Sequence, residues 1–265
     1  MFGIERLQGD MMRAITKYPG EKVYVAKLDI KGYFMSMRRK KLFERITWGL
    51  DRQFVPDEVT GDRGEIYKVC RFLWRKIIFD DPVKGVRIRG RETDWQELDP
   101  SKSLKNQPPG QGIVIGNLTS QLLSNIFLDQ LDRFVTIQLG YKLYGRYVDD
   151  FYIVVPESQL AQLKIDIGRI EKFLLEKLGL TLHPKKRHLQ CVDKGIVFLG
   201  FNVHPRFIVP GKRLKKNFKR AVWNYATGRR ADREVIQSYL GLMEHCNAYN
   251  FIKKVFAGVG WEYDV

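Results

Sequence analysis

The stretch that decides the fold is LYGRYVDDFYIVV, residues 143–155. Its two halves, Leu143 to Tyr147 and Phe151 to Val155, are rich in aromatic and β-branched residues, so they predict two short strands joined by a tight turn. The turn presents two adjacent acids, Asp149 and Asp150. Mg²⁺ prefers carboxylate oxygens and needs only one or two of them, because substrate phosphates and water complete its shell. The hairpin is therefore a candidate metal site, although paired acids also occur in plain solvated turns.

A third acid, Asp29, ends an apolar run that begins at Val23 and predicts a strand. Burying an unpaired carboxylate is costly, so Asp29 needs a cation, a metal ion or a route to solvent. Gly32 follows it and permits close backbone approach to a ligand. The plain alternative is an acid that caps the helix after the strand. Together with Asp149 and Asp150, Asp29 could hold two metal ions.

A glycine-punctuated loop lies between these acids in the sequence, from Gly110 to Gln121. A loop before a helix is weak evidence for phosphate binding, and Asn117 or Thr119 could equally be a helix cap. The helix that follows is amphipathic, and its apolar face is expected to be core. That face comprises Leu122, Leu123, Ile126, Phe127, Leu131 and Phe134.

In their order along the chain, these segments resemble the sequence motifs of reverse transcriptases. Five motifs, A to E, cover most of the chain. They are Asp29 with Phe34 (A), Ile115 to Gln121 (B), Tyr147 to Asp150 (C), Leu178 to Lys186 (D) and Val197 to Phe201 (E, the primer grip).

The resemblance implies an RNA-dependent DNA polymerase in which the primer 3′ hydroxyl attacks the α-phosphate of a deoxynucleotide. Two Mg²⁺ ions, for which Mn²⁺ can substitute, clamp the attacking and leaving oxygens. The implied metal ligands are Asp29, the Ile30 carbonyl, Asp149 and Asp150, and the implied catalytic residues are these three acids with Lys186 of motif D. The implied nucleotide-binding residues are Ile30, Gly32, Tyr33, the steric gate Phe34, Ile115, Gly116 and Gln121. The implied primer grip is Phe198, Leu199, Gly200 and Phe201.

The motif D lysine has an alternative interpretation, and the form of motif B implies a subfamily. Lys185 and Lys186 could instead form a solvated basic turn after Pro184. The Ile-Gly-Asn-x-x-Ser-Gln form of motif B resembles that of diversity-generating retroelements, whose enzymes are error-prone, especially opposite template adenine. Ile115 occupies the position where many relatives carry glutamine, and its side chain cannot hydrogen-bond to the nucleotide. The resemblance also implies a template-repeat RNA and a small basic accessory protein as partners.

Composition agrees with a nucleic-acid partner. The chain has 265 residues, a formal net charge of +16 and 44% hydrophobic residues, which indicate a globular protein that binds phosphate backbones. The segment after the primer grip concentrates this charge and predicts a thumb helix that contacts template and primer phosphates. Its expected contacts are Lys212, Arg213, Lys215, Lys216, Lys219 and Arg220. The interleaved Phe218, Trp223 and Tyr225 are expected to be thumb core rather than base-stacking platforms.

The expected fold is α+β: a right-hand polymerase palm of antiparallel sheet and packed helices in residues 1–203, followed by a helical thumb in 204–265. Motif A arrives by residue 29, so the fingers are expected to be incomplete. Helices are predicted at Ile4 to Ile15, Phe34 to Leu50, Ile66 to Phe79 and Gln159 to Gly179, with a loop or small hairpin at Arg87 to Gly110. Asp80 and Asp81 predict a helix stop. The basic run Arg38, Arg39, Lys40 and Lys41 is expected to form a solvated helix face.

Several other classes of protein are disfavoured. No run approaches the roughly 20 apolar residues that span a bilayer, so we expect no membrane association and a cytoplasmic protein of a bacterium, phage or mobile element. The three cysteines, Cys70, Cys191 and Cys246, indicate neither a disulfide framework nor a zinc site. Two alternatives stay open: a retron or abortive-infection reverse transcriptase, and a non-catalytic RNA-binding protein built on a polymerase palm.

Overall fold

The computed structural model describes residues 2–53, 61–85, 87, 90–91, 93, 98–99, 102–229 and 233–263. The chain forms two compact units, which are described separately. Unit 1 comprises Met1–Leu28, Lys142–Leu163 and Lys186–Val265, and unit 2 comprises Asp29–Tyr141 and Lys164–Lys185. Residues of both the expected palm and the expected thumb lie in unit 1.

Unit 1 is built on an antiparallel sheet with the strand order β2-β3-β1-β4. The hairpin of β2 and β3 has the predicted tight turn, which is two residues long because Tyr147 lies opposite Asp150. Strand β4 pairs with β1 so that His188 lies opposite Lys27. The strands are β1 (Val23–Asp29), β2 (Tyr144–Tyr147), β3 (Asp150–Pro156) and β4 (His188–Cys191).

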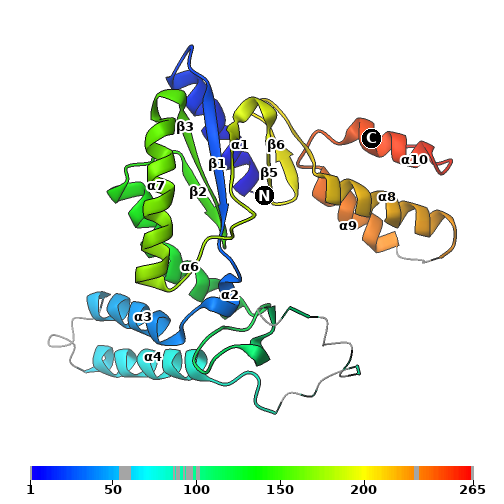
Figure 1. Cartoon of the computed structure of the whole chain (residues 1–265). Helices are drawn as coiled ribbons and strands as arrows, with labels where there is room; N and C mark the ends of the chain where they lie inside the picture. Colours follow the sequence, from blue (N-terminus) through cyan, green and yellow to red (C-terminus); the bar gives the residue numbers. More distant parts are fainter. Residues whose placement is uncertain are drawn as a thin grey trace. The chain divides into compact units, whose positions relative to one another are not determined.

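Helix α1 (Phe2–Lys17) packs against β2 and β3 of this sheet (Figure 1). Its apolar residues recur every three or four positions and face the core, as the predicted helix requires. One buried polar link joins helix to sheet: the Tyr152 hydroxyl donates to Asp10 Oδ2 at 2.8 Å, and Arg13 pairs with the same carboxylate. Burial, followed by this hydrogen bond, raises the pKa of Tyr152.

A second sheet in unit 1 has the order β5-β6-β7. Leu199 and Gly200 form the turn between β5 and β6 with positive φ values of 50° and 89°. A two-residue hairpin turn with both φ values positive matches the right-handed twist of the strands it joins. The strands are β5 (Ile196–Phe198), β6 (Phe201–Val203) and β7 (Ile208–Pro210).

Three helices follow in unit 1: α8 (Lys212–Ala226), α9 (Arg233–Met243) and α10 (Tyr249–Ala257). They enclose a core of their own around the fully buried ring of Phe218. Its other buried members are Val222, Ile236, Met243, Ala248, Ile252 and Phe256.

Unit 2 is helical. The predicted helix over 34–50 is in fact two, because Met37 is extended and its carbonyl accepts a hydrogen bond from Gly112. Helix α4 ends at the predicted stop, with Asp80 as its C-cap, and Gly179 ends the last helix in a left-handed conformation as predicted. The elements are α2 (Tyr33–Ser36), α3 (Arg39–Gln53), α4 (Asp62–Phe79), the 3₁₀ turn Leu104–Asn106, α6 (Leu118–Arg133), its π-helical extension Phe134–Gln138, α7 (Leu160–Phe173, which begins in unit 1) and its π-helical extension Leu174–Leu178.

The expected loop or hairpin over residues 87–110 lies in large part outside the described residues. Within the part that the structure describes, no helix is long and apolar enough to cross a bilayer.

Candidate polymerase active site

Asp29 is the last residue of β1, and it is buried, with 5% of its surface exposed. Its carbonyl accepts the His183 N–H at 2.7 Å, and Ile30 forms a β-bridge with Leu182. The motif D segment therefore runs alongside the backbone of motif A in unit 2. Ile30 is fully buried, backbone included, so its carbonyl is not exposed in this structure.

The turn after Asp29 opens at Gly32, whose φ of 54° is left-handed and favours glycine. The Tyr33 side chain points inward and donates from its hydroxyl to the Ser124 carbonyl of α6 at 2.6 Å. The Phe34 ring is half-buried, 5.4 Å from the Tyr33 ring. Tyr33 thus anchors the turn to α6.

The glycine loop of motif B is hydrogen-bonded to this turn. The Ile113 N–H donates to the Phe34 carbonyl at 3.0 Å, and the Gly112 N–H donates to the Met37 carbonyl at 2.8 Å. Gly112 has a φ of 84°, and a Cβ there would come within 2.4 Å of Leu104 Cδ1. Ile115, two residues after Ile113, has 61% of its surface exposed. The predicted nucleotide-binding residues of motifs A and B are therefore brought together by backbone hydrogen bonds.

The helix after this loop begins with Asn117 at the N-cap position, but the Asn117 side chain makes no capping hydrogen bond. Gly116, with a φ of 102°, and Gln121 are both exposed. Of the face expected to be core, Leu123 and Phe127 are buried, whereas the prediction for Leu122 is wrong. Leu122 lies one turn after the exposed Leu118 on the outer face of α6, whereas the buried Ser120 and Leu123 lie on the inner face.

The motif C turn consists of Val148 and Asp149. Val148 has a φ of 56°, an uncommon conformation for a β-branched residue, and its carbonyl accepts a hydrogen bond from Arg146 Nη1 at 3.0 Å. Strain of this kind costs about 1–3 kcal/mol and persists where the surroundings enforce it. It places Asp149 at the tip of the hairpin and Asp150 at the start of β3.

Lys27 on β1 contacts the second acid of motif C. Its Nζ lies 3.2 Å from Asp150 Oδ1 and 5.9 Å from the centre of the Phe198 ring. One ammonium group thus joins motif C to the primer grip within unit 1. Lys27 was not predicted as a site residue, although the sequence carries a signal for it: a lysine two positions before Asp29, on the same face of an otherwise apolar strand.

The primer-grip hairpin packs into the core of unit 1 on both sides of its turn. The Phe198 ring meets the Tyr152 ring edge-on at 5.5 Å. A Cβ added to Gly3 of α1 would come within 2.9 Å of Leu199 Cδ1. Phe201 is buried as well. The hairpin therefore holds a fixed position against α1 and β3.

Lys186 is exposed in the turn after Pro184, as both a motif D lysine and a solvated basic turn require. The turn is held locally by the Lys185 N–H, which donates to His183 Nδ1 at 3.2 Å. The His183 backbone N–H donates to the Asp29 carbonyl, and this bond fixes the middle of motif D to the end of β1.

The cations expected on the thumb lie on α8. Lys215 and Lys219 pack over the Phe251 ring, with Nζ at 5.6 and 5.9 Å from its centre. The exposed members of the set are Lys212, Arg213, Lys216, Lys219 and Arg220.

The aromatic residues of α8 divide between core and surface. Phe218 is buried, and Tyr225 packs edge-on against Trp261, so the prediction of core packing is confirmed for these two residues. It is wrong for Trp223, which is 53% exposed. Trp223 follows Lys219 by four positions, so it lies on the same helix face as the exposed cations.

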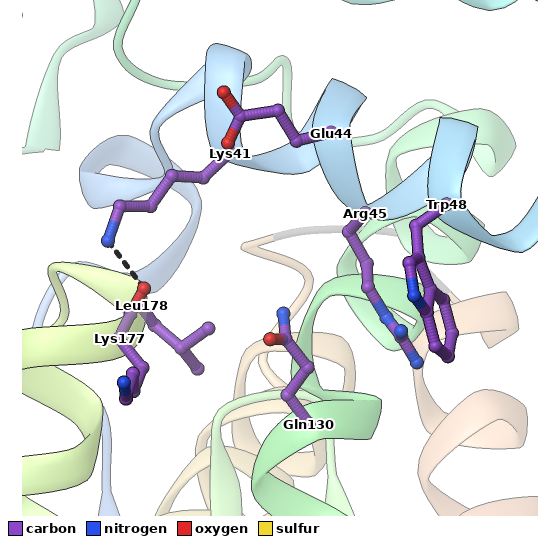
Figure 2. Close-up of a pocket in the computed structure, with 7 residues that line it drawn as sticks. All are labelled: Lys41, Glu44, Arg45, Trp48, Gln130, Lys177 and Leu178. Atoms are coloured by element: carbon purple, nitrogen blue, oxygen red, sulfur yellow. Dashed lines mark hydrogen bonds between the residues drawn. The ribbon is translucent and has the colours of Figure 1, made fainter.

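The basic run Arg38 to Lys41 forms the expected solvated face only in part, because Arg38 and Lys40 are exposed but the other two residues are not. Arg39 is buried, and the Lys41 ammonium donates to the carbonyl of Lys177. Arg45, one turn further, pairs with Asp129. Lys41 and Arg45 line a pocket of about 490 Å³, whose residues are drawn in Figure 2. Its lining residues are Lys41, Glu44, Arg45, Trp48, Gln130, Lys177 and Leu178.

The sequence matches the family described as "Reverse transcriptase (RNA-dependent DNA polymerase)" over residues 2–203. The chain belongs to the reverse transcriptase family. No curated protein matches its sequence. The matched residues include the three carboxylates, the glycine loop and the hairpin at Phe198 to Phe201.

Solved structures show the same fold at low sequence identity. Telomerase from Candida tropicalis in complex with a fragment of telomeric RNA matches with a TM-score of 0.53 and 16% identity, covering 97% of this chain and 42% of the telomerase chain. Apo telomerase from the same organism matches with a TM-score of 0.52 and 16% identity, covering 83% and 39%. This reverse transcriptase chain spans less than half the length of those telomerase chains. The predicted α+β palm of antiparallel sheet and packed helices is confirmed.

Reverse transcriptases use divalent metal ions, and the donor set of this chain fits such an ion. Asp29, Asp149 and Asp150 supply hard carboxylate oxygens, which Mg²⁺ prefers over nitrogen or sulfur ligands. Among the described residues, no three acidic, histidine or cysteine side chains form a complete metal cage by themselves. Mg²⁺ does not need one, because substrate phosphates and water fill most of its octahedral shell.

Proposed function

We propose that this chain is the polymerase part of an RNA-dependent DNA polymerase that copies a template RNA into cDNA by two-metal nucleotidyl transfer. The observation that carries the proposal is the position of the three aspartates. Asp29 ends β1, Asp149 forms the strained hairpin turn and Asp150 begins β3. A protein that only binds RNA has no use for acids at such positions, since carboxylates repel phosphates.

The proposed metal ligands and the residues around them have separate roles. Asp29 and Asp149 would hold Mg²⁺, which when bound stabilises charge on the attacking and leaving oxygens. Lys27 forms an ion pair with Asp150 and would offset part of its negative charge. Phe34 is proposed to exclude a ribose 2′ hydroxyl.

The remaining groups would hold the primer, the leaving group and the duplex. The hairpin at Phe198 to Phe201 would hold the primer end. Lys186 would protonate the leaving pyrophosphate. The exposed cations of α8 would contact template and primer phosphates without reading sequence.

We further propose the diversity-generating retroelement subtype. Its support is Ile115, which is well exposed beside the loop that is bonded to Phe34. An aliphatic group there offers the nucleotide no hydrogen bond, so pairing errors are penalised less. Under this proposal the partners are a template-repeat RNA and a small basic accessory protein. A retron or abortive-infection enzyme is the second candidate, and the identity of co-purifying RNA separates the two.

Primer extension on an RNA template with Mg²⁺ and deoxynucleotides tests the polymerase proposal. Asp149→Ala is expected to abolish extension while RNA affinity stays equal or rises, because the site loses negative charge. Asp81→Ala is the matched control, an acid of the other Asp-Asp pair, in the turn after α4. Extension by Asp149→Ala at the wild-type rate would contradict the assignment.

Sequencing of the cDNA tests the subtype. Ile115→Gln restores a hydrogen-bonding side chain and is expected to lower misincorporation opposite template adenine several-fold, with little change elsewhere. Leu118→Gln is the control, since Leu118 is also exposed at the start of α6. An unchanged error spectrum in Ile115→Gln would rule out this role for the isoleucine.

A further inference from the structure

Arg39, the first residue of α3, is a buried cation with 8% of its surface exposed. Its guanidinium makes two hydrogen bonds, from Nε to the Gly112 carbonyl and from Nη1 to the Asp80 carbonyl, both at 2.8 Å. Burying a charge is costly unless such bonds replace its hydration. The buried guanidinium therefore links two segments of the chain, the glycine loop at Gly112 and the end of α4 at Asp80.

The first of these segments is the glycine loop. Its backbone pairs with the chain around Arg39 in a short ladder: the Arg39 N–H donates to Gly110, the Gly112 N–H to Met37 and the Ile113 N–H to Phe34. The Nε bond of Arg39 adds a side-chain rung to this ladder, at the carbonyl of Gly112. The alignment of the glycine loop with the turn after Asp29 is thus fixed by backbone hydrogen bonds and by the hydrogen bond from the Arg39 guanidinium.

The loop needs such a restraint. Gly110, Gly112 and Gly116 all have positive φ values, of 76°, 84° and 102°. Glycine loses more conformational freedom on ordering than any other residue, so a loop with three of them is costly to hold still. Ile115 lies between the last two of these glycines, and its position depends on how firmly the loop is held.

The second segment is the C-terminal end of α4. Asp80 is the C-cap, and carbonyls at a helix C-terminus carry partial negative charge that a cation stabilises. Arg39 reaches this carbonyl and that of Gly112 at once because the guanidinium is a planar fork with several donors. Lysine, with one ammonium group, cannot reproduce that geometry.

We infer that Arg39 is a positioning residue that fixes the glycine loop, and with it Ile115, in register with Phe34, and so sets nucleotide affinity and selection. The inference rests on the proposed function for its kinetic consequence. Its structural part concerns the order of the loop alone and can be tested without polymerase activity.

The kinetic test compares Arg39→Met and Arg39→Lys with wild type in steady-state extension. Loss of two charge-assisted hydrogen bonds is expected to raise the KM for deoxynucleotide about tenfold in Arg39→Met, with kcat changed less than about twofold. Discrimination against ribonucleotides should fall as well, and Arg39→Lys should lie between Arg39→Met and wild type. Lys40→Met is the matched control, an exposed cation in the same helical turn, and it should match wild type.

The second test is amide hydrogen exchange of the same variants without substrate, well below the unfolding temperature. Residues 110–116 should exchange about tenfold faster in Arg39→Met, whereas the β2–β3 hairpin should not change. Unchanged exchange in the loop, or equal acceleration throughout the chain, would overturn the inference. If wild type fails to extend any primer, the proposed function fails, and the exchange result still decides the role of Arg39.

Discussion

Helices α3 and α8 are both rich in cations, and the same exposed basic face was predicted for each. In α3 three of the charges are bound within the protein: Arg39 and Lys41 donate to backbone carbonyls, and Arg45 pairs with Asp129. In α8 most of the cations face solvent. A run of basic residues therefore does not identify a nucleic-acid surface; what decides is whether protein acceptors lie within reach.

Two tryptophans are exposed in the part of the chain that the structure describes, and they repeat this contrast. Trp48 of α3 is 42% exposed, but Arg45 and Arg52 lie over its ring at 4.1 and 4.4 Å. Trp223 of α8 shares its face with cations that are free to contact a phosphate backbone. The ring of Trp48 contributes to the protein's own stability, and that of Trp223 is available to a base.

The largest effect should come from α8. The triple variant Lys212→Gln, Lys216→Gln and Arg220→Gln is expected to weaken template–primer binding on the order of a hundredfold at 0.1 M salt, because three phosphate contacts are lost. The salt dependence of log K should become less steep by about 2–3 units of slope. Fluorescence anisotropy titrations at several salt concentrations measure both quantities. Unchanged binding by the triple variant would contradict the proposal that the cations of α8, unlike those of α3, contact nucleic acid.

The next effect concerns the exposed ring of α8. Trp223→Ala should weaken binding of single-stranded RNA about tenfold, since base–aromatic stacking contributes about 1–3 kcal/mol. Trp48→Ala is the partner variant and should leave RNA affinity unchanged while it lowers the unfolding temperature. Equal RNA binding by Trp223→Ala and wild type would return Trp223 to a purely structural role.

A smaller effect is expected at the pocket of Figure 2. Arg45→Met removes the ion pair with Asp129 and the cation–π contact with Trp48, so it should lower the free energy of unfolding by about 1 kcal/mol. Asp129 keeps Arg133 at 2.9 Å, which limits the loss. Urea denaturation measures the difference. A change in RNA affinity without a change in stability would show that this pocket faces nucleic acid after all.

The smallest effect is expected at Lys41, which caps the end of the helix containing Lys177. Its Nζ donates to the carbonyl of Lys177 and lies 3.5 Å from that of Glu176. Lys41→Met should cost about 0.5 kcal/mol of stability, the size of a favourable charge at a helix C-terminus. Lys40→Met, on the exposed side of the same turn, should cost nothing measurable in the same denaturation experiment.

Part of this protein could be predicted from the sequence because the relevant signals are local. The alternation of β-branched and aromatic residues around Asp149 and Asp150 predicts a hairpin wherever it occurs, and Gly179 ends its helix by its own backbone freedom. The order of the motifs was equally plain. None of these features depends on what a distant segment does.

Only the tertiary structure decided what each charge does. Arg39 meets a carbonyl 41 positions away, and Lys41 meets one 136 positions away. The pairing of Lys27 with Asp150 likewise joins two strands that are far apart in the chain. Chain folding brings such acceptors within reach, and a buried cation is stable only where they are present. The sequence therefore determined where the acids and cations stand along the chain, and the packing of distant backbone determined which of them remain available to nucleic acid.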